Sequence, residues 1–223
     1  MSLSFYTMST VKSRREQYSD ATRAALIEAA TRRFAEFGFA KTALEDVAAD
    51  INATRGAVYH HFSNKQALFR AVHDTLESAA VDNVTRLAAT ASDPWEGALW
   101  ALDAFLDQCL DPTYSRIVWR EAPTALGWPE WHLAEGTYAY GIIEKLITAL
   151  IATKEIDPVP LDTATRIMFS MLGSAGTTLA EAAPADQRRL RDEYSYLISR
   201  MIKGWRTPSG QAADHGVGEQ TPA

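Results

Sequence analysis

The stretch TALEDVAADINATRGAVYHHF, residues 42–62, carries the signal that decides the fold. Thr42 and Glu45 stand at the two positions of an N-terminal capping box and predict a short helix directly after them. Asn52 lies in the link that follows, and asparagine tolerates the left-handed backbone conformation that a tight turn often needs. A second short helix is predicted over 55–61. Two short helices joined by a tight turn are typical of a helix-turn-helix unit.

Helical patterns continue on both sides of this unit. Apolar residues recur at helical spacing before it, and Gly38 supplies a stop. After it, Ser63 and Gln66 form a second capping-box pattern, and Asp93 with Pro94 marks a further helix start. Sustained period-two alternation, the mark of a β-strand, is absent from the sequence. We predict an all-α protein of about nine helices, near 21–37, 43–50, 55–61, 64–91, 95–110, 112–121, 129–153, 161–182 and 185–206.

The second short helix has the chemistry to contact DNA. Gly56 and Ala57 are small, so the front of this helix can approach base edges closely, and Arg55 can donate two hydrogen bonds to guanine. The helix N-terminus adds backbone donors and a favourable dipole for phosphate. Three further side chains are donors that could reach phosphate oxygens: Tyr59, His60 and His61. Each alone could equally be a surface or core residue.

These residues resemble the N-terminal DNA-binding domain of the tetracycline-repressor (TetR) family of transcriptional regulators. The resemblance covers about Thr22 to Val72. It rests on Ala29, Ala30, Phe34, Gly38, Thr42, Asp46, Val47, Ala48, the run from Gly56 to Phe62, Lys65, Leu68 and Phe69. Two positions depart from the family pattern. Asn52 replaces the usual turn glycine, and Ala43 stands where a hydroxyl residue is common, so one phosphate contact near Thr42 would be missing.

The resemblance implies roles for individual residues. Arg55, Ala57 and His60 fall where family members read bases. Phosphate contacts are implied for Thr42, Tyr59, His61 and Lys65, and the core of the small domain for Phe34, Val47 and Phe62. The complete predicted DNA-binding set is Thr42, Thr54, Arg55, Gly56, Ala57, Tyr59, His60, His61 and Lys65. The predicted domains are a flexible arm at 1–19, the helix-turn-helix domain at 20–65, a ligand-binding and dimerisation domain at 66–206, and a disordered tail at 207–223.

Composition and charge agree with this assignment. The chain has 223 residues, of which 47% are hydrophobic and 22% charged, as in ordinary globular proteins. The single cysteine, Cys109, excludes an intramolecular disulfide, and no apolar run is long enough for a membrane span, so we expect a cytoplasmic protein. The first 65 residues carry nine Lys/Arg against seven Asp/Glu, whereas the remainder is strongly acidic. An anionic partner is therefore expected at the N-terminal domain only.

Aromatic residues predict a ligand pocket in the second domain. All six tryptophans lie outside the predicted DNA-binding domain, and five of them fall between 95 and 131. Several aromatic side chains around a few polar groups suit a small apolar ligand, although any one of these rings could instead be a core residue. The predicted pocket residues are Trp95, Trp100, Phe105, Trp119, Trp128, Trp131, Tyr138 and Met168.

The last two predicted helices carry apolar stripes that suggest a homodimer. A two-fold dimer can read a palindrome, and one helix-turn-helix alone rarely binds DNA tightly. The core of a monomer is the alternative explanation of the stripes. The predicted interface residues are Met171, Leu172, Ala175, Leu179, Tyr194, Leu197 and Met201.

We therefore predict a homodimeric regulator that binds a double-stranded operator and responds to a small, largely apolar or aromatic effector, most simply as a repressor. An activator or a ligand-independent DNA-binding protein is one alternative. A helical-bundle carrier or enzyme is another, but the sequence shows no catalytic constellation. We expect no cofactor and no metal site: Asp103, Asp107 and Asp111 recur every four residues, a pattern usual for a solvated acidic face. The sequence does not identify the effector or the operator.

Overall fold

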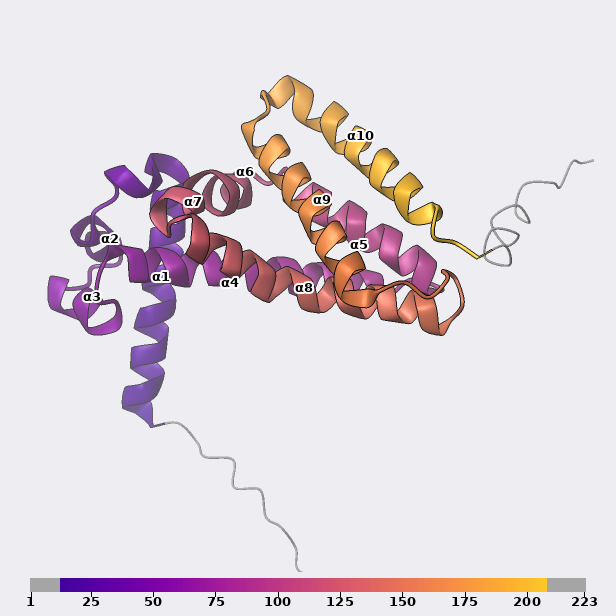
Figure 1. Ribbon diagram of the computed structural model, residues 1–223. Helices are drawn as coiled ribbons and strands as arrows, with labels where there is room; N and C mark the ends of the chain where they lie inside the picture. The colour runs from indigo at the N-terminus through magenta and orange to yellow at the C-terminus, as the bar shows by residue number, and fades with distance from the viewer. Residues whose placement is uncertain (1–12, 208–223) are drawn as a thin grey trace, which may run out of the picture.

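The structure is a computed structural model that describes residues 13–207, and these residues form a small helical head and a larger helical body (Figure 1). The helices α6, η1 and α7 follow one another without a break. Counting them together, the described residues form nine helical segments, as predicted. Their bounds are α1 Arg14–Lys41, α2 Leu44–Asp50, α3 Arg55–His61, α4 Lys65–Ala88, α5 Pro94–Gln108, α6 Pro112–Tyr114, η1 Ser115–Glu121, α7 Ala122–Ala125, α8 Trp128–Ala152, α9 Leu161–Glu181 and α10 Pro184–Lys203.

The first helix begins earlier than predicted. The Ser13 hydroxyl accepts a hydrogen bond from the Glu16 amide, and the Glu16 carboxylate accepts one from the Ser13 amide, which completes a capping box at Arg14. Residues 14–19 are therefore helical, and the prediction of a flexible arm is wrong for them. Residues 1–12 of the predicted arm, and 208–223 of the predicted tail, lie outside the described residues.

The two capping boxes predicted elsewhere are also wrong. The Thr42 side chain is buried and its hydroxyl donates to the Gly38 carbonyl at 2.9 Å, so α2 begins without a side-chain cap. Helix α4 is capped by Asn64, whose side chain accepts from the Ala67 amide at 2.8 Å. The predicted start of α5 is confirmed, since Asp93 accepts from the Glu96 amide at 2.8 Å.

The head consists of α1, α2, α3 and the first turns of α4, packed around an apolar core. Phe34, Val47 and Phe62 are buried there, as predicted. The ring of Phe34 meets that of Phe69 on α4 edge-on, with ring centroids 5.0 Å apart. Phe37 is 42% exposed, whereas Phe39 packs against Phe34 and Phe69. Asn52 adopts the expected left-handed conformation, with φ 53°.

The chain turns sharply within α1, at Gly38. This residue has φ 80° and ψ 168°, a conformation open to glycine and strongly disfavoured for other residues. A side chain at this position would also overlap the carboxylate of Glu121 on η1. Gly38 therefore ends the regular part of α1, as predicted, and allows the body to approach the head closely.

The body is a bundle of long helices that extends from the head (Figure 1). Helix α4 runs from the head core into the bundle, where it packs against α5 and α8, while α9 covers α8 and η1, and α10 packs on α5 and α9. At the far end, a bridge between Ile156 and Arg206 and an ion pair of Arg206 with Glu155 at 2.8 Å tie the end of α10 to the loop after α8. None of the helices in the described part is long and apolar enough to cross a membrane.

Candidate DNA-binding surface and ligand cavity

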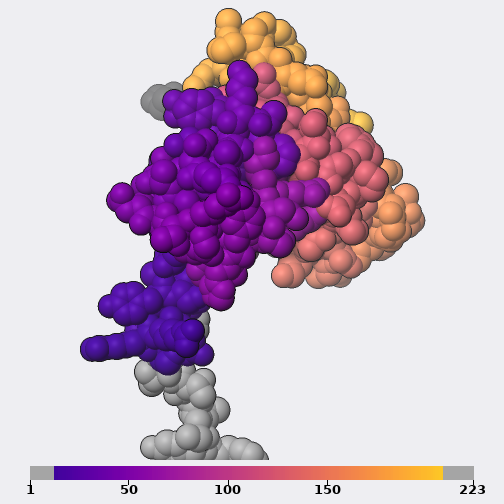
Figure 2. Space-filling view, turned by 90° about the vertical axis from the view of Figure 1, so that its left-hand side faces the viewer, coloured from indigo at the N-terminus to yellow at the C-terminus, as the bar shows by residue number. Residues whose placement is uncertain are grey.

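Helix α3 presents most of the predicted DNA-binding residues on the outside of the head. Thr54 caps this helix by accepting from the Ala57 amide at 3.2 Å, which fixes its orientation. Arg55 and Tyr59 are exposed side by side, with the guanidinium 5.3 Å from the centre of the phenol ring. Arg55 also pairs with Glu45 of α2 at 3.1 Å. Figure 2 looks onto this side of the head, where the segment coloured indigo to purple faces outward.

The two histidines of α3 differ in exposure. His60 is exposed, whereas His61 is half-buried, and their rings lie 5.2 Å apart. Burial, followed by the nearby charges of His60 and Arg23, lowers the pKa of His61. Its ring is therefore neutral at pH 7, and one ring nitrogen can still donate a hydrogen bond.

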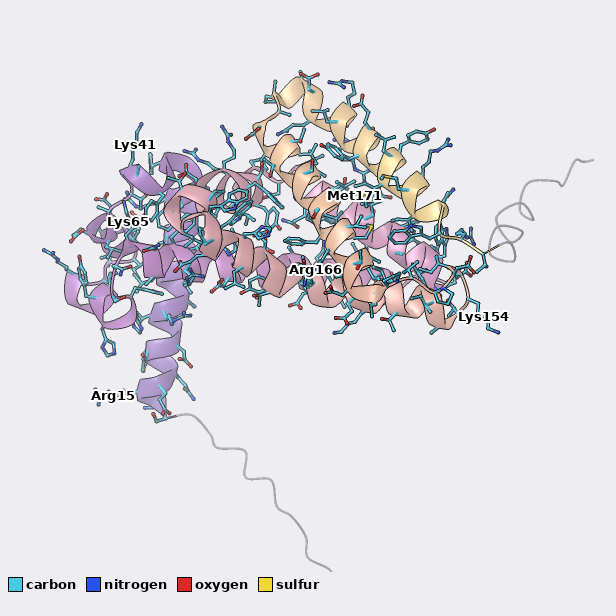
Figure 3. All side chains as sticks on the ribbon, in the orientation of Figure 1. Arg15, Lys41, Lys65, Lys154, Arg166 and Met171 are labelled. Carbon is cyan, nitrogen blue, oxygen red and sulfur yellow. The ribbon has the colours of Figure 1, made fainter. Side chains whose placement is uncertain are left out.

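Two residues predicted to contact phosphates, Thr42 and Lys65, form hydrogen bonds within the protein. The prediction is wrong for the Thr42 side chain, which is buried and bonded to Gly38. The Lys65 ammonium donates to the carbonyls of Phe39 at 2.8 Å and Ala40 at 3.3 Å, so it stabilises the C-terminal end of α1. An ammonium has three protons, so one remains for another acceptor. Figure 3 labels Lys65 and Lys41, both in the head.

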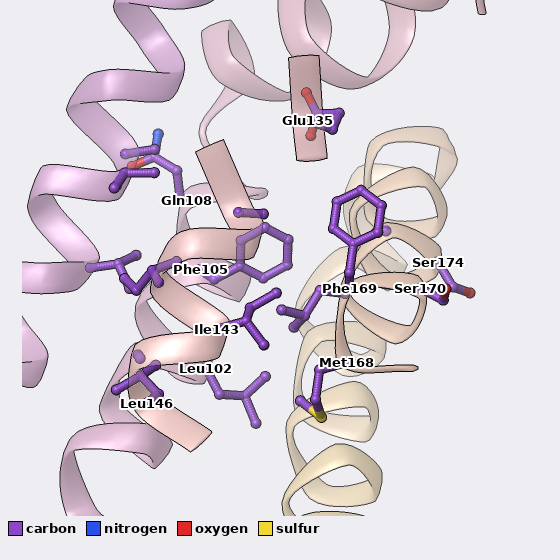
Figure 4. Close-up of a pocket in the computed structure, with 18 of the residues that line it drawn as sticks. Leu102, Phe105, Gln108, Glu135, Ile143, Leu146, Met168, Phe169, Ser170 and Ser174 are labelled. Atoms are coloured by element: carbon purple, nitrogen blue, oxygen red, sulfur yellow. The ribbon is translucent and has the colours of Figure 1, made fainter. Parts of the chain in front are cut away.

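The body encloses a cavity of about 520 Å³ between α4, α5, α8 and α9, within the usual size range of ligand pockets. Phe105 and Phe169 enter it from opposite sides, with Leu102 and Met168 along the same walls (Figure 4). Five of the predicted pocket residues line the cavity: Phe105, Trp119, Trp128, Trp131 and Met168.

Three predicted pocket residues do not line the cavity. Trp95 is buried beneath the guanidinium of Arg206, which lies 4.3 Å from its ring centre. Trp100 faces outward and is partly exposed. Tyr138 lies one position from the wall residue Ala139 and turns towards Asp74 on α4 instead. Neighbouring positions on a helix point about 100° apart, so a residue that is next to a wall residue in sequence can face away from the cavity, as Tyr138 does.

The cavity has a polar end, which the sequence analysis missed. Glu77 of α4 and Glu135 of α8 are buried side by side in its wall. Glu77 accepts a hydrogen bond from the Tyr114 hydroxyl at 2.6 Å, and Glu135 lies 3.2 Å from Nε2 of His73. Figure 4 shows Glu135 above the rings of the cavity.

Burial changes the ionisation of these groups. Burial and the nearby Glu135 charge raise the pKa of Glu77 to about 8, so this carboxyl group is mostly protonated at pH 7. Burial lowers the pKa of His73, but the hydrogen bond and charge of Glu135, with Glu77 and Asp74, outweigh it and leave the pKa raised. Burial also raises the pKa of Tyr114 far above its ordinary value. The contact with Glu135 thus favours a protonated His73 ring, beside a mostly neutral Glu77.

One ligand atom from each of His73, Glu77 and Glu135 lies within 4.8 Å of the other two, a spacing from which a metal ion could be held. Each group already has a protein partner, and we assign no metal to them. A sequence signal existed for the cluster: His73 and Glu77 are spaced four residues apart in line with the buried Phe69, Ala80 and Val84. Two polar residues in a buried stripe indicate a polar site inside the body.

A second connection joins head and body, through η1. Arg116 donates to the carbonyls of Ala35 at 2.8 Å and Glu36 at 3.1 Å, and Glu121 accepts from the Phe39 amide at 3.0 Å. We call these contacts of Arg116 and Glu121 with the end of α1 the η1 clamp. The same short helix carries Trp119, which lines the cavity. Helix η1 thus contacts both the head and the wall of the cavity.

Gly176 on α9 makes room for Trp119, and a methyl group there would overlap the indole ring. The Gly176→Ala variant is expected to lose about 1–3 kcal/mol of folding free energy, because the ring must leave its place in a packed core. The Trp119 contribution to fluorescence should shift with it. Thermal and urea unfolding measure the loss, with Gly173→Ala, where a methyl group meets nothing within 4 Å, as the control. Equal stability of the two variants would contradict this packing.

The predicted dimer-interface residues separate into buried and exposed groups. The prediction is wrong for Ala175 and Leu179, which are fully buried inside the protomer because α9 packs on α8 and η1. Leu172 lines the cavity, Met171 is half-buried against the core, and the Tyr194 hydroxyl bonds that of Thr178 at 2.9 Å. Leu197 and Met201 are 56% and 57% exposed on α10.

A helix-turn-helix head attached to a larger helical body that contains a cavity is an arrangement typical of DNA-binding transcriptional regulators. Two family models match: "Bacterial regulatory proteins, tetR family" over residues 26–72 and "Tetracyclin repressor-like, C-terminal domain" over residues 95–205. The chain belongs to the TetR family of transcriptional regulators. The all-α fold with an N-terminal helix-turn-helix is thereby confirmed.

Relatives support the family assignment over different parts of the chain. The HTH-type transcriptional regulator TtgR of Pseudomonas putida is 46% identical over 63 residues, which are 28% of this chain and 30% of that protein. The transcriptional repressor Rv1474c of Mycobacterium tuberculosis is 30% identical over 155 residues, 66% of this chain and 76% of that protein. The crystal structure of a TetR-family regulator from Pectobacterium atrosepticum superposes with a TM-score of 0.76 at 27% identity, covering 88% of this chain and 98% of that one.

Proposed function

We propose that this regulator is a homodimeric repressor that leaves a palindromic operator when a small ligand enters the body cavity. The observation that carries the proposal is the cavity of about 520 Å³ and its link to the head. Trp119 of η1 lines the cavity, and Glu121 of the same helix accepts a hydrogen bond from the Phe39 amide in the head. A ligand that prefers one arrangement of the body then biases the position of the head, which is the thermodynamic requirement for allosteric release.

On the DNA side, α3 is proposed to enter the major groove. Its exposed residues project beyond the head, and Thr54 fixes its N-terminus. A methyl group added at Gly56 would meet nothing closer than 3.8 Å within the protein, so the fold itself does not require glycine there. Glycine at this position instead lets the backbone of α3 approach the DNA closely. When α3 docks in this way, Arg55 leaves its ion pair with Glu45 and contacts the DNA. Breaking this pair costs little, because an exposed ion pair stabilises the free protein only weakly.

Replacing Arg55 by alanine is expected to lower discrimination at one base pair of each half-site by about tenfold or more, because a bidentate contact to guanine is lost. Affinity for random DNA should fall much less. Competition binding against single-base operator variants measures the effect, with Arg32→Ala on α1 as a control that removes the same charge from an exposed surface position. Equal losses on operator and random DNA would show that Arg55 reads no base.

For assembly, we propose that α9 and α10 of two protomers pack into a four-helix interface. Exposed apolar side chains gather on the outer faces of these two helices: Ile167 on α9, and Tyr196, Leu197 and Met201 on α10. A two-fold axis through this surface would place two copies of α3 on one side of the dimer, as palindrome recognition requires.

Two routes are proposed to carry the ligand signal. Helix α4 reaches from Phe69 in the head core to Glu77 in the cavity wall, and the η1 clamp joins Trp119 of the cavity to the end of α1. Movement of either element would change the separation of the two α3 helices, which must match half-sites a helical turn or a multiple of it apart, about 34–36 Å per turn.

Fluorescence anisotropy with DNA from upstream of the protein's own gene tests the proposal, together with a ligand screen read by tryptophan emission. We expect tight binding to a discrete site and release by compounds that alter the emission. Binding that no cavity ligand changes would favour a ligand-independent regulator. Transcription that rises with bound protein would favour an activator, and lack of specific binding would favour the carrier or enzyme alternative.

A further inference from the structure

The wall of the cavity contains acidic side chains but no lysine or arginine among the described residues. Two carboxyl groups, those of Glu77 and Glu135, face it. Of the nearby imidazoles, that of His73 lies behind Glu135 and is fully buried, whereas that of His132 lies in the wall and is solvent-exposed. An anionic ligand beside Glu77 and Glu135 would therefore have no lysine or arginine to pair with, at a high electrostatic cost in an apolar site.

We propose that the cavity selects ligands with a single positive charge, a protonated amine or quaternary ammonium on an apolar aromatic body, whose charged group binds beside Glu77 and Glu135. This inference rests on the proposed function only in taking the cavity as the effector site. The rings of Phe105, Trp119 and Trp131 would contact the apolar body. Their faces also attract cations.

The charges of the cluster balance for such a ligand. In the free protein, the raised pKa of His73 favours a protonated ring paired with Glu135, and Glu77 is mostly protonated, so the cluster has no net charge in that state. When a monocation arrives beside it, Glu77 can release its proton to solvent and become the counter-ion. The site is then neutral again, which avoids an unpaired buried charge.

This exchange makes binding depend on pH. The charged and titratable groups around Glu77 are His73 and Asp74 on its own helix, Glu135 and Tyr138 on α8, Tyr114 on α6, and the buried thiol of Cys109 at the end of α5. Binding of a cation favours the ionised form of Glu77, whose pKa in the free protein is about 8. Affinity should therefore rise with pH by about tenfold per unit below that value, and level off above it.

The test uses two matched pairs of probes with the full-length, EDTA-treated protein in the absence of DNA. One pair is crystal violet and its uncharged leuco form. The other is (2-naphthylmethyl)trimethylammonium and 2-neopentylnaphthalene, in which carbon replaces the charged nitrogen. Quenching of tryptophan emission gives the affinities from pH 6 to pH 9. We expect each cation to bind at least about tenfold tighter than its neutral partner at pH 8, and only the cations to show the pH dependence.

Variants assign the effect to the cluster. Glu77→Gln keeps the size of the side chain and an acceptor for Tyr114, so it should fold. It should lose the pH dependence and most of the preference for the cation. Glu144→Gln removes an exposed carboxylate of the same bundle and should behave like the wild type. Equal affinity of both members of each pair, unchanged cation preference in Glu77→Gln, or no binding of either cation would overturn the proposal.

Further results distinguish this proposal from a metal site and from the proposed ligand-responsive function. If Zn²⁺ alone binds the wild type but not Glu77→Gln, and the organic cations do not bind, the cluster is a metal site and the proposal is overturned. If the cations bind as expected but leave operator affinity unchanged, the charge selectivity stands and the proposed ligand-responsive function fails. If neutral compounds bind the cavity and release the operator, the proposed function stands and the charge selectivity fails.

Discussion

Glutamate in place of both Leu197 and Met201 is expected to convert the proposed dimer into a monomer and to lower operator affinity by at least about 100-fold. These side chains are more than half exposed in the protomer, at 56% and 57%, so their replacement leaves the fold of one chain intact. At a packed interface, the same changes bury four charges without partners, which dissociates the subunits. A monomer contacts one half-site only and loses the second set of contacts.

Light scattering measures the mass and anisotropy measures the operator affinity of the same samples. Leu133→Glu is the matched control, because this leucine is also exposed but belongs to α8 and not to α9 or α10. It should leave both mass and affinity unchanged. If the Leu197→Glu, Met201→Glu variant stays dimeric with wild-type affinity, then α10 does not form the interface.

Breaking the η1 clamp is expected to abolish the ligand response while operator binding persists. Glu121→Gln weakens the bond to the Phe39 amide, and Arg116→Gln removes the bonds to Ala35 and Glu36. None of these groups lies on α3. Allosteric coupling of about 1–3 kcal/mol corresponds to a 5- to 150-fold change in operator affinity on ligand binding, and in the double variant this ratio should fall towards one.

The ratio is measured by anisotropy with and without crystal violet, or whichever compound of the screen releases the operator. Arg166→Gln is the control, since it removes an exposed arginine whose partners, Asp162 on α9 and the ring of Tyr140 on α8, both belong to the body. Melting temperatures identify any general loss of stability. A clamp variant that still releases the operator by the wild-type factor would assign the coupling to α4 alone.

The head could be predicted closely because its signals are local. The apolar periodicity around Phe34, the conformation that Asn52 adopts, and the small residues of α3 are each set within a few positions of the chain. The cap positions were harder to predict, because a polar side chain near a helix start can bond elsewhere once the chain is packed. Thr42 turns inward to Gly38 and leaves α2 without a side-chain cap, and Asn64 rather than Ser63 caps α4.

The body could be predicted only in outline. Its aromatic content indicated a cavity, but which rings face it depends on contacts between helices far apart in sequence, so Trp95, Trp100 and Tyr138 were misplaced. Ala175 and Leu179 form an apolar stripe that fits a core as well as an interface, and α9 uses them for the core. The Glu77–Glu135 pair joins α4 to α8 and is visible only once these helices are packed together.

Selection of binding sites from a pool of random duplex DNA, with the purified full-length protein, tests the central claim most directly. The account predicts enrichment of one inverted repeat, bound by an even number of chains, with half-sites a helical turn or a multiple of it apart, about 34–36 Å per turn. The Arg55→Ala variant should select the same spacing with one base pair of each half-site relaxed. A pool that remains random, or enriches a single half-site bound by one chain, would contradict the account.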